Sequence, residues 1–275
     1  MLAPSLQHRL LGDHLCEVLR SGAAAQADAA TWMPFERRLR RHVGELSNAL
    51  AALYGGREDF MGVMERVALT AWGGWCARPQ VWRERDLRRE ERPDWFLDQS
   101  MVGAVCYADL WAGGLAGLKA RIAELRELGV TYLHVMPPFR CPDGNSDGGY
   151  AVSSYREVQP SLGTMDELRE LAVALHEHGI SLCLDFIFNH TSNEHEWAQR
   201  AVQGQAPYEG YFLLFPDRTL PDAYDRTVRE IFPDQHPGAF TQLPDGRWVW
   251  TTFNSFQWDL NYANPLVFDA MAAEL

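Results

Sequence analysis

The first 92 residues carry apolar positions at helical spacing and no clear strand pattern. Apolar side chains recur every three or four residues in two stretches, Leu39-Val43-Leu46-Leu50-Leu53 and Phe60-Val63-Met64-Val67. Four arginines between residues 37 and 41 could bind an anionic ligand, but Glu36 and Glu45 flank them, and a solvated helix face is the simpler interpretation. The mixed charges of residues 83–92, followed by Pro93, predict the end of a helix and a domain boundary.

From residue 101 the pattern changes to alternating strands and helices. Short apolar runs predict three strands, at 101–107, 130–136 and 180–188. Helical spacing predicts two intervening helices, at 115–128 and 164–178, and a loop is expected at 139–163. Thr164 and Glu167 fit a capping box at the start of the second helix. This β-α-β-α-β order predicts an α/β fold with a parallel sheet and right-handed crossovers.

The third predicted strand carries the residues that most suggest chemistry. Residues 180–188 form an almost unbroken apolar run, typical of a strand buried on both faces, with one acid, Asp185, inside it. That carboxylate needs a partner, because burying it unpaired is costly. The run continues into Asn189-His190, and in a parallel α/β barrel the active-site residues lie at the carboxyl ends of the strands. A core strand capped by two polar residues is the alternative interpretation.

Residues 189–262 lack a crossover helix and are rich in aromatic residues. A connection of this length is expected to have structure of its own, so we predict a small inserted subdomain. Its aromatic side chains could stack on sugar rings or pack a small core. A further helix is expected from Asn264 as N-cap and Pro265 in the first turn. Because three strands are too few to close a barrel, we expect the chain to be truncated; a natural open sheet is the alternative.

The chain is acidic, which narrows the class of its partners. Its net charge is −12 and its pI about 5.2, which argues against nucleic acid or an anionic membrane as the main partner. The five cysteines form no C-x-x-C pair, so reduced, mostly buried thiols are expected rather than disulfides. The start has no leader pattern and no stretch has membrane-spanning length, so we expect a cytoplasmic protein. Glu194-His195-Glu196 lacks the spacing of a zinc motif, and we expect no metal.

Four short motifs occur in an order that is informative as a set. They are Gly129-Val-Thr-Tyr-Leu-His-Val-Met-Pro137, Ser146-Asp-Gly-Gly-Tyr150, Asp185-Phe-Ile-Phe-Asn-His190 and Gln257-Trp-Asp-Leu-Asn261. In this order the sequence resembles glycoside hydrolase family 13, the α-amylase family, and is most similar to its amylosucrase branch. The likeness is dense over residues 101–275, whereas the helical region before it matches in architecture alone.

The resemblance implies a helical N-terminal domain followed by a partial (β/α)8 TIM barrel that contains the first three strands. The implied parts are a helical domain (1–92), the first part of the barrel (93–188), domain B inserted after the third strand (189–262) and the start of the third barrel helix (263–275). The implied function is transfer of the glucosyl unit of sucrose to an α-glucan acceptor, with retained configuration, release of fructose and no cofactor. A sucrose hydrolase of the same family and a non-catalytic, vestigial fragment are the alternatives.

The resemblance also assigns roles to individual residues. Asp147 would bind sugar hydroxyls and pair with a later arginine, Tyr150 would stack under the sugar ring, and His190 would donate to a ring hydroxyl. Phe253 and Gln257 of domain B would face sucrose. Asp185 and Asn189 would orient the site. Asp147 as a turn-former, His190 as a core histidine and Gln257 as scaffolding are the alternatives. The family's nucleophile motif, G-x-R-x-D, is absent after the third predicted strand, so this chain is expected to be inactive alone.

Overall fold

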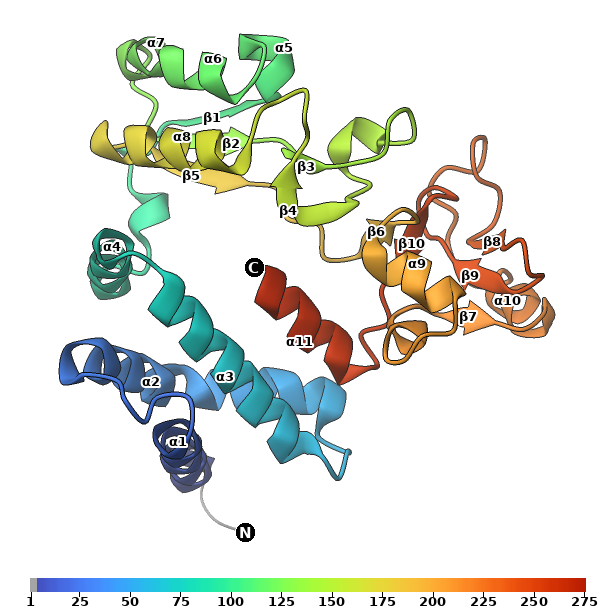
Figure 1. The fold of residues 1–275 in the computed structure, drawn as a ribbon, viewed down its shortest axis with the longest axis horizontal. Helices are drawn as coiled ribbons and strands as arrows, with labels where there is room; N and C mark the ends of the chain where they lie inside the picture. Colours follow the sequence, from blue (N-terminus) through green and yellow to red (C-terminus); the bar gives the residue numbers. More distant parts are fainter. Residues whose placement is uncertain (1–3) are drawn as a thin grey trace. The chain divides into compact units, whose positions relative to one another are not determined.

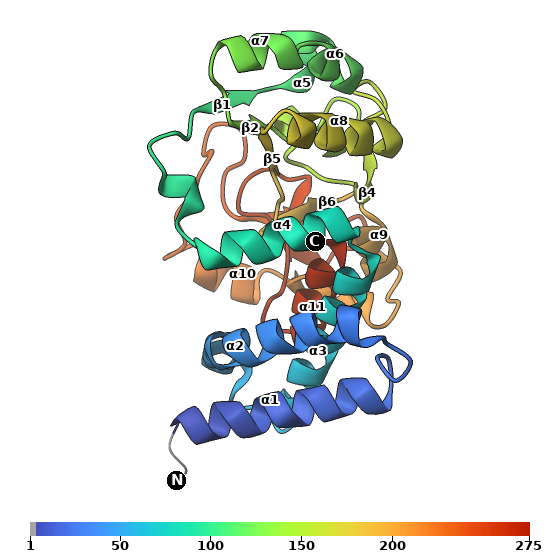
Figure 2. The same ribbon diagram turned by 90° about the vertical axis from the view of Figure 1, so that its left-hand side faces the viewer.

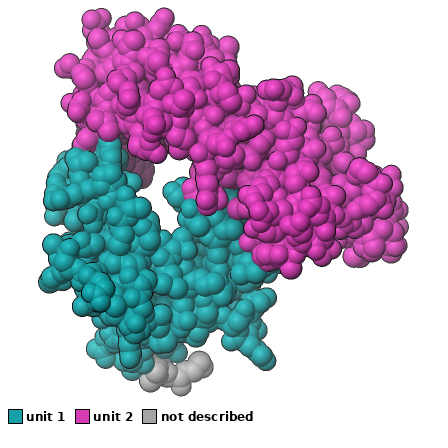
Figure 3. Space-filling model, in the orientation of Figure 1, with its two compact units in different colours: residues 1–93, 262–273, 275 teal, residues 94–261, 274 magenta. Residues whose placement is uncertain are grey.

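A computed structural model of the protein describes residues 4–275. The chain divides into two compact units, coloured separately in Figure 3. One holds the described residues up to Pro93 together with 262–273 and 275, and the other holds 94–261 and 274. Within residues 4–275 we find no helix that combines the length and the apolar character needed to cross a membrane. The four-part division predicted from the sequence stays a prediction.

The first unit is built from helices, as the apolar spacing predicts. Its helices before Pro93 are α1 (Pro4–Ser21), α2 (Ala29–Tyr54), α3 (Phe60–Ala77) and α4 (Gln80–Glu91), drawn in blue to teal in Figure 1. Their apolar faces form one core that includes Leu39, Val43 and Val63. The predicted stripe is wrong at Leu53, which is exposed; Tyr54 is buried instead, because it follows the buried Leu50 by one helical turn.

Helix α11 (Pro265–Glu274) packs on this helical unit through residues 265–273. Its predicted N-cap is confirmed, because the Asn264 side chain accepts a hydrogen bond from the backbone N–H of Leu266 at 3.1 Å. Phe268 packs against the helical core, and Asp269 forms an ion pair with Arg66. The expectation that this segment begins the third barrel helix stays a prediction.

The second unit contains the predicted parallel sheet. Its order is β1-β2-β5, and the strands are β1 (Gly103–Cys106), β2 (Tyr132–Val135) and β5 (Ser181–Leu184). The helices that accompany them are η1 (Trp95–Leu97), α5 (Ala108–Ala112), α6 (Leu115–Ala120), α7 (Ile122–Glu127) and α8 (Met165–Glu177). Figures 1 and 2 show α8 beside β2 and β5, and Leu171 and Leu175 of α8 share a core with Leu133 and Val135 of β2. The capping box at Thr164 is also confirmed.

Several local expectations are corrected by the structure. Each strand is shorter than its apolar run, and the helix predicted at 115–128 is two helices separated at Arg121, whose φ and ψ are −96° and 12°. The strand at 180–188 ends at Leu184 and is mostly half-buried, because β5 pairs on one side with β2 and has no second partner in the described sheet. Of the five thiols only Cys16 is buried, so the expectation of mostly buried cysteines is wrong.

The segment expected as a plain loop contains a short antiparallel hairpin. It consists of β3 (Phe139–Arg140), the helical turn η2 (Asp147–Gly149) and β4 (Ser154–Val158). The 3₁₀ turn η2 lies between the two strands of the hairpin, so the hairpin carries the Ser146–Tyr150 motif between its strands.

Residues 189–261 fold as an excursion whose two ends pair with each other. Its elements are β6 (His190–Ser192), α9 (Glu196–Val202), η3 (Tyr208–Tyr211), β7 (Leu214–Phe215), α10 (Thr219–Tyr224), β8 (Phe240–Gln242), β9 (Trp248–Trp250) and β10 (Gln257–Asp259). Strands β6 and β10 are antiparallel, with His190 opposite Asp259. Strands β7, β9 and β8 form a second sheet, and Phe215 and Phe240 pack there against Trp248 and Trp250. These aromatic residues therefore form a small core.

Candidate functional site

Asp147 lies in a turn whose backbone is unusual for a side-chain-bearing residue. Its φ is 50°, and the two following glycines, Gly148 and Gly149, have φ values of 66° and 95°. Aspartate tolerates the left-handed region better than most residues, and glycine enters it freely. The Asp147 side chain is exposed, and its Oδ2 accepts a hydrogen bond from Nε2 of Gln257 at 3.0 Å. The turn thus presents a carboxylate to solvent while one buried amide holds it.

Tyr150 and Asp185 form the second part of the site. The Tyr150 hydroxyl donates to Oδ2 of Asp185 at 3.1 Å, and His134 of β2 approaches Oδ1 of the same carboxylate at 3.0 Å through Nε2. Burial, and then the neighbouring Asp185 charge, raise the pKa of Tyr150 to about 12, so its phenol stays protonated and donates. Both oxygens of Asp185 are therefore used to hold neighbouring side chains.

His190 is almost fully buried, with 5% of its surface exposed. Its Nε2 lies 3.1 Å from the carbonyl oxygen of Tyr150 and 3.0 Å from Nε2 of Gln257, and its Nδ1 lies 3.3 Å from Nδ2 of Asn189. Burial lowers the pKa of His190, so the ring is neutral at pH 7. Both ring nitrogens face protein atoms, and donation from His190 to a sugar hydroxyl stays a prediction.

The two predicted contributors from the excursion differ in their surroundings. The Phe253 ring lies beside the His190 ring, with 5.2 Å between centroids. Gln257 is 0% exposed, and its Oε1 accepts from Nδ2 of Asn254 at 2.8 Å while its Nε2 faces Asp147 and His190. Protein groups surround the amide atoms of Gln257, and its expected contact with sucrose stays a prediction.

Asn189 joins the start of the excursion to its end. Its Nδ2 donates to Oδ2 of Asp259 at 3.2 Å, and Asp259 also accepts from the backbone N–H of Thr252 at 2.8 Å and from its hydroxyl at 2.6 Å. Burial raises the pKa of Asp259, and these three donors oppose that rise. In the described part of the chain, no group of three or more His, Cys, Asp and Glu side chains lies close enough together to hold a metal ion.

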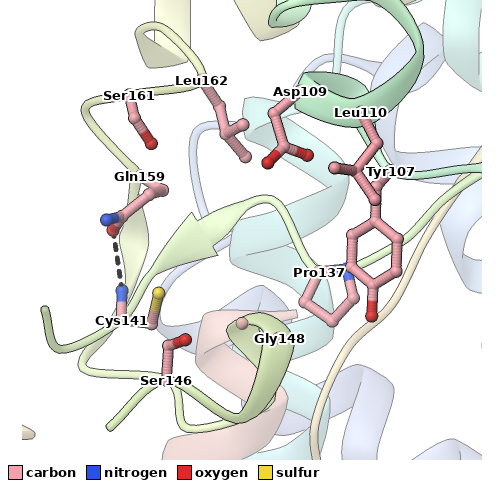
Figure 4. A pocket seen from close by; sticks show the side chains of 11 residues that line it. Tyr107, Asp109, Leu110, Pro137, Cys141, Ser146, Gly148, Gln159, Ser161 and Leu162 are labelled. Carbon is pink, nitrogen blue, oxygen red and sulfur yellow. Dashed lines mark hydrogen bonds between the residues drawn. The ribbon is translucent and has the colours of Figure 1, made fainter. Parts of the chain in front are cut away.

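Two residues near the site were missed by the sequence reasoning. His134 is a polar residue inside the apolar run of β2, which was the available signal. Tyr107 directly follows β1, at the carboxyl end where barrel sites form. Tyr107 lines a cavity of about 310 Å³ together with Asp109, Gln159 and Gly148, so this cavity lies against the Asp147 turn. Figure 4 shows these residues around it.

As a group, the described contacts suit binding better than bond cleavage. Asp147 offers an exposed acceptor, Tyr150 a held aromatic ring, and His190 a neutral imidazole. The carboxylates of Asp185 and Asp259 are occupied by protein donors. Asp147, Tyr150, Asp185, Asn189, His190, Phe253 and Gln257 are linked by these contacts, although the sequence separates them by up to 110 positions.

A family model and individual known proteins both match this chain. Residues 80–274 match the model of the α-amylase catalytic domain. The chain is 35% identical over 188 residues to a trehalose synthase of Pimelobacter, covering 66% of this chain and 32% of that protein. It is 32% identical over 168 residues to an α-glucosidase of Apis mellifera, covering 58% and 28%. The chain thus spans about a third of the length of these curated relatives.

Solved structures agree with this match. A MutB mutant in complex with the substrate sucrose superimposes with a TM-score of 0.57 and 27% identity, covering 66% of this chain and 33% of that one. The trehalulose synthase MutB from Pseudomonas mesoacidophila MX-45 gives a TM-score of 0.55 and 26% identity, covering 64% and 32%. Together with the parallel sheet, these matches indicate the TIM-barrel fold of glycoside hydrolase family 13. The chain belongs to the α-amylase family.

Proposed function

We propose that this chain forms one wall of the glucosyl pocket of an amylosucrase-like enzyme. Such an enzyme transfers the glucosyl unit of sucrose to an α-glucan, with retained configuration and release of fructose. The observation that carries the proposal is the exposed Asp147 carboxylate, held by Gln257 in a left-handed turn next to Tyr150. A strained backbone around an exposed polar group is typical of a binding site. Sucrose is the substrate in the matched MutB complex, which supports this choice of sugar.

The chemistry of the wall suits a single sugar ring. An exposed carboxylate such as Asp147 accepts hydrogen bonds from two adjacent hydroxyl groups, which are the polar groups that a glucosyl unit offers. The Tyr150 hydroxyl is tied to Asp185, so its ring is fixed and its flat face is a platform for the apolar face of the sugar. Phe253 and His190 enclose the same region from the excursion.

We further propose that the 275 residues bind the glucosyl unit without breaking its bond. Retaining cleavage needs a nucleophile and an acid/base, with carboxyl groups about 5 Å apart. In this chain Asp185 holds Tyr150 and His134, and Asp259 holds Thr252 and Asn189, so neither is free for that role. The G-x-R-x-D motif, which in the family carries the nucleophile, does not occur in residues 189–275; the one match in the sequence, Gly55–Asp59, lies between helices α2 and α3, far before the sheet.

The test is direct binding of sucrose to the purified chain. Ligand-observed NMR should show saturation transfer to the glucosyl protons, and Asp147→Ala and Tyr150→Leu should each abolish it. Asp143→Ala is the matched control, because Asp143 is an exposed acid of the same loop and makes no contact with Gln257. A chain that binds no sucrose would favour the vestigial alternative, and fructose release above a buffer blank would contradict the expected inactivity.

A further inference from the structure

Two side-chain amides enclose the ring of His190, one at each nitrogen. Nδ2 of Asn189 lies 3.3 Å from Nδ1, and Nε2 of Gln257 lies 3.0 Å from Nε2 of the ring. We propose that Gln257, acting together with Asn189, is a positioning residue that holds His190 in its neutral form and couples its protonation to that of Asp147. The proposal rests on the proposed function for the roles of Asp147 and His190 in the pocket.

The orientation of each amide is set by a carboxylate. An ionised carboxylate only accepts hydrogen bonds, so the nitrogen of a neighbouring amide must face it. Oδ2 of Asp147 lies 3.0 Å from Nε2 of Gln257, and Oδ2 of Asp259 lies 3.2 Å from Nδ2 of Asn189. Each amide nitrogen carries two hydrogens, and the second one of each remains for the ring. Both amides therefore approach His190 as donors.

This arrangement disfavours the imidazolium form. A neutral imidazole has one lone pair and can accept a hydrogen bond from one amide, whereas an imidazolium has none. The carbonyl oxygen of Tyr150, 3.1 Å from Nε2, requires the proton on that nitrogen, and Nδ1 then accepts from Asn189. A second proton, on Nδ1, would place an N–H group of the ring opposite an amide N–H group at both nitrogens. Burial of the ring lowers the pKa of His190 in the same direction.

One unfavourable contact remains in the neutral form, between an N–H of Gln257 and the N–H of His190, and Asp147 maintains it. In the neutral ring the second N–H of Gln257 faces the N–H of His190, and the amide cannot turn, because its Oε1 would then face the Asp147 carboxylate. If Asp147 is protonated or replaced by an amide, Gln257 can present Oε1 to the ring and stabilise an imidazolium, provided that the Asn254 amide, which donates to Oε1 at 2.8 Å, turns with it. The other titratable groups near the ring are Asp259, opposite His190 on β10, and Tyr155, whose hydroxyl lies 3.5 Å from the His190 carbonyl oxygen.

The test is an NMR titration of the His190 ring in the 275-residue chain, which needs no sugar. In the unmodified protein the ring should stay neutral below pH 6, with the proton on Nε2. Gln257→Glu puts an acceptor at Nε2 and should raise the pKa of His190 by at least 1 unit, a tenfold change in its protonation equilibrium. Asp147→Asn removes a charge that raises the pKa of His190, but it also frees the Gln257 amide to turn; the proposal expects the turn to prevail and this pKa to rise. Gln199→Glu, on the exposed face of α9, is the control for an added charge.

The outcomes separate this inference from the proposed function. An upward shift in both site variants and none in Gln199→Glu supports the inference, even if sucrose does not bind. Equal shifts in Gln257→Glu and Gln199→Glu would overturn it, and so would an ordinary pKa of His190 in the unmodified protein. If Gln257→Glu does not fold, Asp147→Asn decides, because its side chain is exposed and similar in size; no shift there, or the downward shift that loss of the Asp147 charge alone would cause, would overturn the coupling.

Discussion

His195 is a buried histidine whose ring caps a helix, and we expect acid to destabilise the fold through it. It is 5% exposed, and its ring packs between those of Tyr155 and Trp197, with centroids 5.8 and 4.7 Å away. Its Nδ1 accepts a hydrogen bond from the backbone N–H of Trp197 at 3.1 Å, at the start of α9. Burial lowers the pKa of His195 to about 4. Protonation of Nδ1 would in addition remove the cap.

The sign and size of the effect follow from linkage. In the unfolded chain the pKa of a histidine is about 6.5, so between pH 6.5 and 4 the unfolded state binds a proton that folded His195 does not. This contribution is therefore fully present above pH 6.5 and is lost progressively as the pH falls toward 4. A difference of about 2.5 pKa units corresponds to about 3 kcal/mol, of which about 2 kcal/mol is lost by pH 5.

The assay is urea unfolding of the chain and of His195→Asn at pH 7.5 and pH 5. Asparagine is a good N-cap without a titrating ring, so at pH 7.5 the variant should lose the aromatic packing and keep the cap. Between the two pH values the unmodified protein should lose about 2 kcal/mol more than the variant. The other titrating groups, His190 among them, are common to both proteins and cancel in this difference. Equal losses in the two proteins would refute the reasoning.

Three further substitutions test the packing. Gly148→Ala should lower the free energy of unfolding by about 1–2 kcal/mol, because φ is +66° and the new Cβ would lie 3.0 Å from the Tyr107 hydroxyl; Tyr107→Phe should restore part of this in urea titrations. Tyr54→Phe removes a 2.7 Å hydrogen bond to the Tyr262 carbonyl oxygen and should cost about 1 kcal/mol, and an unchanged melting temperature would contradict this. Strand β1 is an edge of the β1-β2-β5 sheet and Val105 on it is 62% exposed, so we expect chains to associate through this edge. Val105→Lys should reduce that association in sedimentation velocity, and equal association of both proteins would argue against the edge contact.

The sequence predicts the order of the elements well, because each signal is local. The change from helical spacing to short apolar runs near residue 101 marks the start of the sheet region, and the Thr164–Glu167 cap is encoded within four residues. Strand ends are different, because they depend on partners. The apolar run continues to Phe188, but the strand ends at Leu184, and Asp185 uses its side chain to bind Tyr150. The packing of α11 on the helical unit likewise depends on residues far away in the sequence, such as Arg66, which pairs with Asp269.

The residues of the candidate site were predicted from motifs, but their contacts were not. A motif identifies Gln257, yet nothing in the local sequence shows that its amide is buried against Asp147 and His190. His134 was missed for a similar reason: its link to Asp185 joins two strands through side chains at their carboxyl ends. Residue identity is thus readable from the sequence, whereas the orientation of an amide or a ring depends on groups far along the chain.

These long-range contacts make the site depend on closure of the excursion. The Asp147–Gln257 hydrogen bond joins residues 110 positions apart, and Asn189–Asp259 joins residues 70 positions apart. Both end on β10, whose strand pairing with β6 is three residues long, while the parallel sheet is supported by the core that α8 shares with β2. Opening of β6 from β10 would release Asp147 and His190 together and leave β1, β2 and β5 paired. Loss of the contacts of the candidate site should therefore precede unfolding of the sheet.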